Sequence, residues 1–141
     1  MTSLLFDTGA FIALADKGDE LHSRAVDFFE TLPTQTRRFT TQAIVAETYT
    51  FLRYNQGGSA ALCWLDFLDR AQGTGHLVLL YADQDDDGQA RNLIRRFADQ
   101  TLSYTDALSL VAVQKCGLQG IFGFDHHLAL AGVPVLPGPL R

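Results

Sequence analysis

Apolar residues in this chain fall into short continuous runs that alternate with stripes of helical spacing. Runs at residues 4–6, 76–81 and 120–124 are typical of strands buried on both faces, and weaker strand patterns occur near 38–40 and 133–136. Apolar residues that recur every three or four positions predict helices over 8–15, 21–32, about 41–55, about 59–72 and 126–131. Two further helices are predicted, one that starts with the acidic run at 83–87 and extends to about Phe97, and one from Ser103 to near Gly117. Strands that alternate with helices predict an α/β fold with a mainly parallel central sheet.

Residues typical of helix starts and ends support this division of the chain into strands and helices. Thr41 suits the N-cap of the helix that follows it, and Pro33 and the pair Gly57-Gly58 are stop signals. The acidic run at 83–87 is mainly a helix N-terminus signal, because early acids complement the helix dipole, with a place at the rim of a site as the alternative. The segment 104–116 is apolar almost all round and should be a buried helix.

Length and composition narrow the class of protein. A chain of 141 residues is most simply one domain over 1–141, which can bury roughly 68% of its unfolded surface. The apolar runs are too short to span a bilayer and no basic region precedes the first one, so we expect a cytoplasmic protein with no membrane partner. Cys63 and Cys116 have no metal-binding spacing, and we expect reduced thiols in the core.

Four acids are the candidate chemistry. Asp7 and Asp125 each follow a predicted buried strand, Asp106 lies in the first turn of the predicted buried helix, and Glu47 shares a helix face with apolar residues. Ligands in open α/β sheets bind beyond the carboxyl ends of the strands. The four carboxylates are therefore expected to converge on one pocket at that edge.

Each acid also has an ordinary structural explanation. Asp7 and Asp125 can be the N-caps of the helices that follow them, and Asp106 lies three residues after Ser103, as in a capping box. Glu47 lies in mid-helix and has no capping role.

The four together imply a cation. Two carboxylates about 4 Å apart repel by roughly 4 kcal/mol at an effective dielectric constant near 20, so a cluster must bind protons or a metal. Oxygen ligands without cysteine favour Mg²⁺ or Mn²⁺. Such a metal suits phosphoryl chemistry, in which it activates water and neutralises phosphate charge.

At this point the chain resembles the PIN-domain nucleases, and in particular the toxin nucleases called VapC. The resemblance covers nearly the whole sequence and rests on five segments in order, namely Leu5-Phe6-Asp7-Thr8, 22–25, 40–47, 102–107 leading to Cys116-Gly117, and Phe122-Gly123-Phe124-Asp125. It implies a three-layer α/β/α fold and a metal-dependent endoribonuclease, with Asp7, Glu47, Asp106 and Asp125 as the catalytic, metal-binding acids. It also implies an RNA substrate, a homodimer, and an antitoxin protein bound in an apolar groove of the early helices.

Two positions depart from the family pattern. Gly9 and Gly123 stand where the family often has hydroxyl or amide side chains near the first and last acids. Their absence removes groups that would orient the carboxylates and puts catalytic strength in doubt.

Rival functions are weighed against this one. The stretch Asp7-Thr8-Gly9 is also the signature of aspartic proteases, but those proteases resemble all-β folds and this chain has several helical patterns. A catalytically silent PIN domain that only binds RNA or a protein is the stronger alternative. The net charge of −5 argues against binding nucleic acid by bulk electrostatics.

Residues for substrate contact are less clearly marked. His126 and His127 can assist at the site, although starting the last helix is the favoured interpretation. The basic candidates are Arg37, Arg38, Arg53, Arg91, Arg95 and Arg96.

Overall fold

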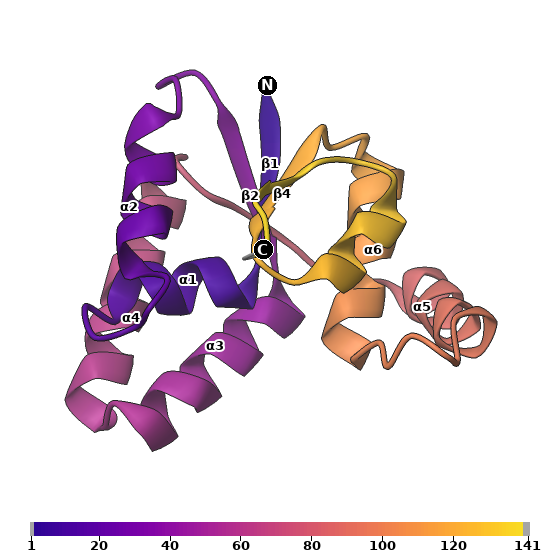
Figure 1. Cartoon of the computed structure of the whole chain (residues 1–141), viewed down its shortest axis with the longest axis horizontal. Helices are drawn as coiled ribbons and strands as arrows, with labels where there is room; N and C mark the ends of the chain where they lie inside the picture. The colour runs from indigo at the N-terminus through magenta and orange to yellow at the C-terminus, as the bar shows by residue number, and fades with distance from the viewer. Residues whose placement is uncertain (1, 140–141) are drawn as a thin grey trace.

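A five-stranded sheet forms the centre of the molecule in the computed structural model, which describes residues 2–139 (Figure 1). The strands lie in the order β3-β2-β1-β4-β5, and every neighbouring pair is parallel. Their bounds are Ser3–Phe6 for β1, Arg37–Thr41 for β2, Val78–Leu80 for β3, Gly120–Gly123 for β4 and Val135–Pro137 for β5. The predicted parallel sheet is confirmed.

Helices cover both faces of this sheet and complete the expected three layers. Figure 1 shows α1, α2 and α4 on one side of the strands and α5 and α6 on the other. The bounds are Thr8–Ala15 for α1, His22–Thr31 for α2, Gln42–Asn55 for α3, Gly58–Gly73 for α4, Gln84–Arg96 for α5, Tyr104–Cys116 for α6 and His126–Ala131 for the 3₁₀ helix η1. All seven helical segments expected from the apolar spacing are present.

Side-chain caps begin several helices where the sequence predicts them. The Thr41 hydroxyl accepts a hydrogen bond from the Ile44 N–H at 3.1 Å at the start of α3. Asp83 and Asp86 form a reciprocal capping box at the start of α5, which confirms the helix-start interpretation of the acidic run. At the other end of α6, Gly117 takes a left-handed conformation with φ of 63°, which glycine adopts without steric cost.

Aromatic side chains join the central strands to the helical layer that contains α2. Phe122 of β4 is fully buried, and its ring centroid lies 5.0 Å from that of Phe6 on β1 and 4.8 Å from that of Phe28 on α2. Every residue of β1 and β4 is buried because both faces of these inner strands are covered. These two buried strands directly precede two of the candidate acids, Asp7 after β1 and Asp125 after β4.

Two expectations about burial are wrong. The run 76–81 forms only the three-residue strand β3, and Val78 is 43% exposed because β3 pairs with β2 alone and lies at the sheet edge. Cys63 and Cys116 are free thiols, as expected, but both are exposed on the outer surfaces of α4 and α6 and not in the core. The spacing of apolar residues predicts a helix or a strand, but it does not show which of its faces is left uncovered by the rest of the fold.

One domain over residues 1–141 stays a prediction, because Met1 and residues 140–141 lie outside the described part of the chain. Among residues 2–139, no helix combines the length and the apolar character that crossing a membrane requires.

The aromatic contact between β1 and β4 is expected to dominate stability. Phe122→Ala should lower the free energy of unfolding by about 3–5 kcal/mol, because it opens a cavity in the centre of the core. Tyr54→Ala, at a position 84% exposed on α3, should change it by less than about 0.5 kcal/mol. Urea denaturation measures both, and equal losses for the two variants would contradict this arrangement.

Candidate functional site

Asp7 lies where β1 ends and α1 begins. Its backbone N–H donates to the Phe122 carbonyl at 3.0 Å, which extends the pairing of β1 with β4 by one residue. Its own carbonyl accepts from the N–H groups of Ala10 and Phe11 and so starts the first turn of α1. The main chain therefore fixes Asp7 from both sides, at the carboxyl edge of the central strand.

The Asp7 carboxylate is buried without adequate partners. Its residue is only 6% exposed, and its Oδ1 atom has no hydrogen-bond partner among the described residues. Burial raises the pKa of this carboxyl to about 7, and the negative charge of Asp106 adds to the rise. Glu47 raises it further, while the backbone N–H groups of residues 8 and 9 oppose the shift.

Asp106 faces the same place from α6. α6 directly precedes β4, which is parallel to β1. The chain therefore returns along α6 from the carboxyl edge of the sheet to the edge where β4 begins, and the first turn of α6 lies at the carboxyl edge. The Ser103 hydroxyl accepts from the Asp106 N–H at 3.0 Å, and Asp106 Oδ2 accepts from the Ser103 N–H at a long 3.4 Å. Burial raises the pKa of the Asp106 carboxyl, with smaller contributions from the charges of Asp125 and Glu47.

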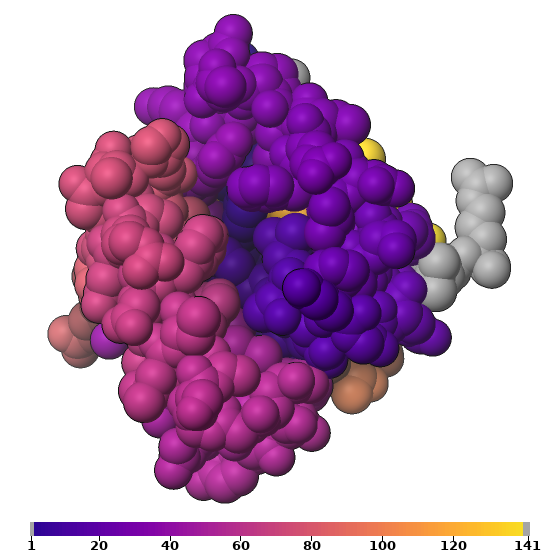
Figure 2. Space-filling model, turned by 90° about the vertical axis from the view of Figure 1, so that its left-hand side faces the viewer, coloured from indigo at the N-terminus to yellow at the C-terminus, as the bar shows by residue number. Residues whose placement is uncertain are grey.

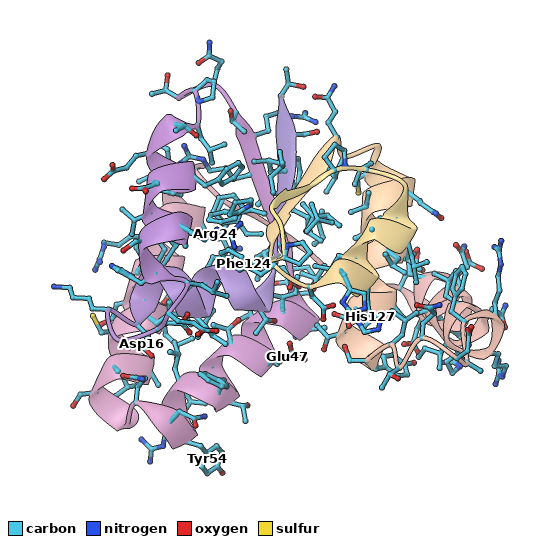
Figure 3. The ribbon with its side chains drawn as sticks, in the orientation of Figure 1. Asp16, Arg24, Glu47, Tyr54, Phe124 and His127 are labelled. Atoms are coloured by element: carbon cyan, nitrogen blue, oxygen red, sulfur yellow. The ribbon has the colours of Figure 1, made fainter. Side chains whose placement is uncertain are left out.

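Glu47 and Asp125 are the exposed members of the group. Glu47 projects from the middle of α3, and Asp125 follows β4 with only Phe124 between them. Figure 3 shows Glu47 on α3, next to the carboxyl edge of the sheet, and His127 beyond β4 on the side of α6. The site thus has a buried side formed by Asp7 and a solvent-facing rim.

The four predicted acids are near enough to influence one another. The charges of Asp106 and Glu47 raise the pKa of Asp7, and the charges of Asp125 and Glu47 raise the pKa of Asp106. These pairwise effects link the four residues, but among residues 2–139 no three of their carboxylate oxygens lie within 4.8 Å of one another, so convergence on one pocket stays a prediction. We name the group Asp7, Glu47, Asp106 and Asp125 the acid cluster.

The capping alternatives divide among the acids. The Asp7 side chain makes no capping hydrogen bond, so capping does not explain its position. Asp106 does take part in a capping box, and Asp125 Oδ1 accepts from the His127 N–H at 2.9 Å to cap η1. Asp106 and Asp125 therefore do cap helices. Each carboxylate has two oxygen atoms, so capping does not prevent it from also binding a ligand.

Gly123 is in contact with the buried acid. A Cβ atom at this position would lie 3.3 Å from the Asp7 Cβ, 3.6 Å from Asp7 Oδ2 and 3.2 Å from a Leu128 methyl carbon. A small hydroxyl side chain here would be within reach of the Asp7 carboxylate, but the space is tight. Gly9 is further away, because its Cβ would meet only the Phe124 ring, at 3.8 Å. Of the two departures from the family pattern, Gly123 is the one that bears directly on Asp7.

The basic candidates are scattered. Arg37 and Arg38 begin β2 and so lie at the opposite edge of the sheet from the acid cluster. Arg91 is tied to the start of α6, because it donates to the Tyr104 hydroxyl at 3.1 Å and pairs with Asp87.

Two interactions between α5 and α6 could not be predicted from sequence spacing. The Tyr104 hydroxyl donates to Asp87 at 2.5 Å, and Lys115 donates to the buried Asp86 at 3.0 Å. These bonds hold α5 against α6 and thereby brace the helix that carries Asp106. Both link side chains 17 or more residues apart, which spacing alone does not pair.

The acid cluster fits a divalent cation. An unpartnered buried carboxylate oxygen costs free energy unless an ion, a proton or water satisfies it. Here that atom, Asp7 Oδ1, belongs to a group with other carboxylates nearby and a pKa raised to about 7. The donor set is all oxygen, which suits hard cations.

Comparison with known proteins identifies the family. A family model described as PIN domain matches residues 4–133. The chain belongs to the PIN-domain family. It is 26% identical over 129 residues to the 23S rRNA-specific endonuclease VapC20 of Mycobacterium tuberculosis, covering 92% of this chain and 94% of that protein.

Solved structures agree with this assignment. The crystal structure of Mycobacterium tuberculosis VapC20, a toxin that cleaves the sarcin-ricin loop, matches with a TM-score of 0.82 and 25% identity over 92% of this chain and 95% of that one. FitAcB from Neisseria gonorrhoeae matches with a TM-score of 0.67 and 15% identity over 94% and 95% of the two chains, which shows the fold alone. The recognised PIN-domain resemblance, with its VapC-like character and three-layer fold, is confirmed.

The raised pKa of Asp7 predicts an unusual dependence of stability on pH. Between its unfolded value of 3.8 and about 7, the folded state holds more protons than the unfolded state, so stability falls as pH rises through this window. The full shift corresponds to at most roughly 4 kcal/mol. Metal-free protein should therefore unfold more easily at pH 8 than at pH 5 in urea.

Asp7→Asn should remove most of this fall and stabilise the metal-free protein at pH 8. Asp69→Asn, at an exposed position of α4, should retain the dependence of the wild type. If the free energy of unfolding fell with pH as steeply in Asp7→Asn as in Asp69→Asn, buried Asp7 would not be the cause of the fall.

Proposed function

We propose that this protein is an endoribonuclease that depends on Mg²⁺ or Mn²⁺ and hydrolyses RNA phosphodiester bonds at the acid cluster. The observation that carries the proposal is the buried Asp7 carboxylate, whose Oδ1 atom has no partner among the described residues and whose pKa the charges of Asp106 and Glu47 help to raise. The proposed metal ligands and catalytic residues are Asp7, Glu47, Asp106 and Asp125. The alternative is a catalytically silent PIN domain that binds RNA or a protein.

The chain's own residues have distinct parts in this proposal. Asp7 holds the cation from the buried side, because the main chain of β1, β4 and α1 leaves its carboxylate little freedom. Asp106 is oriented by Ser103, and Glu47 and Asp125 complete the set from the exposed rim. The chemistry supplied on binding a divalent cation is activation of water as the nucleophile and neutralisation of phosphate charge.

The same electrostatics explains why a cation is needed. A cluster of carboxylates repels the phosphates of RNA, and the chain carries a net charge of −5. A divalent cation bound in the cluster cancels two of its negative charges and presents a positive centre to the phosphate, so substrate binding and catalysis would depend on the same ion. RNA is the proposed substrate because the relative VapC20 is a 23S rRNA-specific endonuclease.

Substitution of the buried acids tests the activity. Asp7→Asn and Asp106→Asn should each lower Mg²⁺- or Mn²⁺-dependent cleavage of a labelled RNA hairpin by at least roughly 100-fold, because each removes a charged ligand. Asp69→Asn is the matched control and should cleave like the wild type.

Thermal melts would show that all three variants are folded. Undiminished cleavage by folded Asp7→Asn would overturn the assignment of the site. Binding of the RNA by wild type without cleavage in either metal would favour the silent alternative.

A second surface fits a protein partner. Two adjoining cavities of about 470 and 290 Å³ share the side chains of Phe6, Phe11, Phe29 and Phe67, and we call their union the aromatic groove. Figure 2 shows the hollow between α2 and α4, with α1 at its floor. The groove lies on the helical layer away from α6, so an occupant would leave α6 uncovered.

We propose that an antitoxin protein binds in the aromatic groove and that this chain is the toxin of the pair, as its VapC-like character suggests. An amphipathic helix suits a groove of this shape and apolar lining. Arg38, Arg70 and His76 border one end of it, so an acidic residue is expected at the corresponding end of the partner. Trp64 also lines the groove, whereas Phe28 packs against Phe122 in the core.

A charge placed in the groove should break this complex and leave catalysis intact. Phe67→Glu puts a carboxylate at the position shared by both cavities, where the ring is 47% exposed. It should abolish co-purification with the protein encoded directly upstream of this chain's gene. Tyr54→Glu, outside the groove, should not. Retained co-purification by Phe67→Glu would place the partner elsewhere.

The homodimer and the cytoplasmic location also remain proposals. Light scattering by the purified protein decides the first, since a dimer has twice the molar mass of the 15.5 kDa chain.

A further inference from the structure

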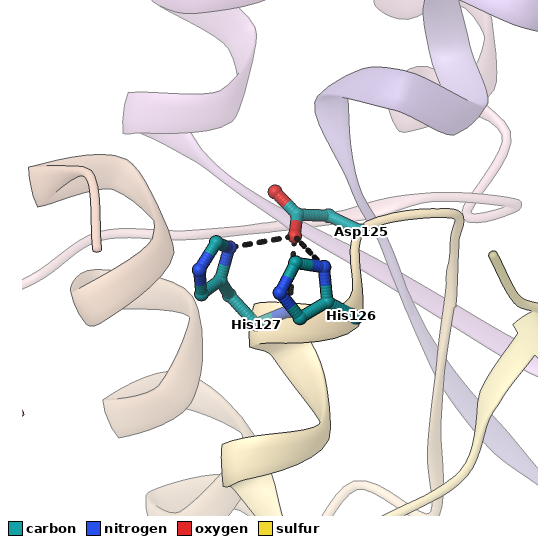
Figure 4. A group of neighbouring side chains, drawn as sticks. All are labelled: Asp125, His126 and His127. Atoms are coloured by element: carbon teal, nitrogen blue, oxygen red, sulfur yellow. Dashed lines mark hydrogen bonds and ion pairs between the residues drawn. The ribbon is translucent and has the colours of Figure 1, made fainter. Parts of the chain in front are cut away.

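Two histidines turn toward the last acid of the cluster. Figure 4 shows the imidazoles of His126 and His127 on the same side of Asp125. The His127 Nδ1 atom lies 2.9 Å from Asp125 Oδ1, and the His126 Nδ1 atom lies 3.8 Å from the same oxygen. The ring centroids are 4.1 Å apart and the ring planes are tilted by 34°.

Helix capping explains only part of this arrangement. A cap requires the bond from the His127 backbone N–H to Asp125, which is present. It does not require either ring to face the carboxylate. His126 is too far from Asp125 for a hydrogen bond, and its side chain is 71% exposed, so packing does not impose its position either.

We propose that Asp125, His126 and His127 bind a first-row transition ion such as Co²⁺ or Zn²⁺ at the rim of the acid cluster. One ligand atom from each of the three residues lies within 4.8 Å of the others. Ligands about 2.1 Å from a shared ion lie at most about 4.2 Å apart. Rotation of the exposed His126 ring is enough to close the difference.

The ligand types decide which ions suit this position. Imidazole nitrogen favours later first-row ions such as Co²⁺ and Zn²⁺, whereas Mg²⁺ and Mn²⁺ prefer oxygen ligands. A site with two imidazoles and one carboxylate is therefore chemically distinct from the all-oxygen site around Asp7. The inference is linked to the proposed function only through Asp125, which belongs to both sites. Binding at the histidines does not require Asp7.

The experiment isolates the histidine site in the Asp7→Asn background, which weakens the all-oxygen site. Co²⁺ is titrated into Asp7→Asn and into Asp7→Asn carrying His126→Asn and His127→Asn, followed by calorimetry and by the visible absorption of the ion. Removing groups that only support a metal ligand weakens binding about 10- to 100-fold. Loss of two direct ligands should weaken Co²⁺ binding at least about tenfold and change its absorption.

His76→Asn in the same background is the matched control, because His76 is exposed and bonds only to Thr74 among the described residues. His126→Asn alone tests the proposal should the triple variant fold poorly, since that ring is mostly exposed. Unchanged affinity and absorption in the histidine variants, or an equal loss in His76→Asn, would overturn it. RNA cleavage by otherwise wild-type protein is measured separately, so failure of the proposed nuclease activity is distinguishable.

Discussion

The site depends on keeping a carboxylate buried among other negative charges. Asp7 is almost inaccessible, yet Asp106 and Glu47 act on it electrostatically and one of its oxygens has no partner among residues 2–139. Such a group destabilises a protein unless it is protonated or neutralised by a cation. The backbone bond of Asp7 to β4 holds the residue in this unfavourable place, and the missing side chain at Gly123 leaves room for it.

The topology of the sheet explains why these acids meet. In a parallel sheet with helical crossovers, the carboxyl ends of the strands and the first turns of the following helices share one edge. Asp7, Asp106 and Asp125 come from such positions, although about 100 residues of sequence separate the first from the others. The aromatic groove lies among α1, α2 and α4, so the proposed metal site and the proposed partner groove lie on different surfaces.

Local rules predicted most of the fold and the members of the candidate site. Apolar spacing predicted the helices, and the pattern of a buried strand followed by an acidic residue indicated Asp7 and Asp125. Burial was less predictable, because the edge position of β3 and the exposure of Cys63 depend on which layers cover which faces. Contacts between distant side chains, such as Tyr104 with Asp87, and the approach of Gly123 to Asp7 arise only from tertiary packing.

The most direct test of the account is a crystal of this protein soaked in Mn²⁺, with anomalous scattering used to locate the ion. The account predicts a Mn²⁺ peak in contact with the Asp7 and Asp106 carboxylates in the wild type, and no peak there in Asp7→Asn. A Mn²⁺ concentration that supports RNA cleavage but leaves this position empty in the wild type would contradict it.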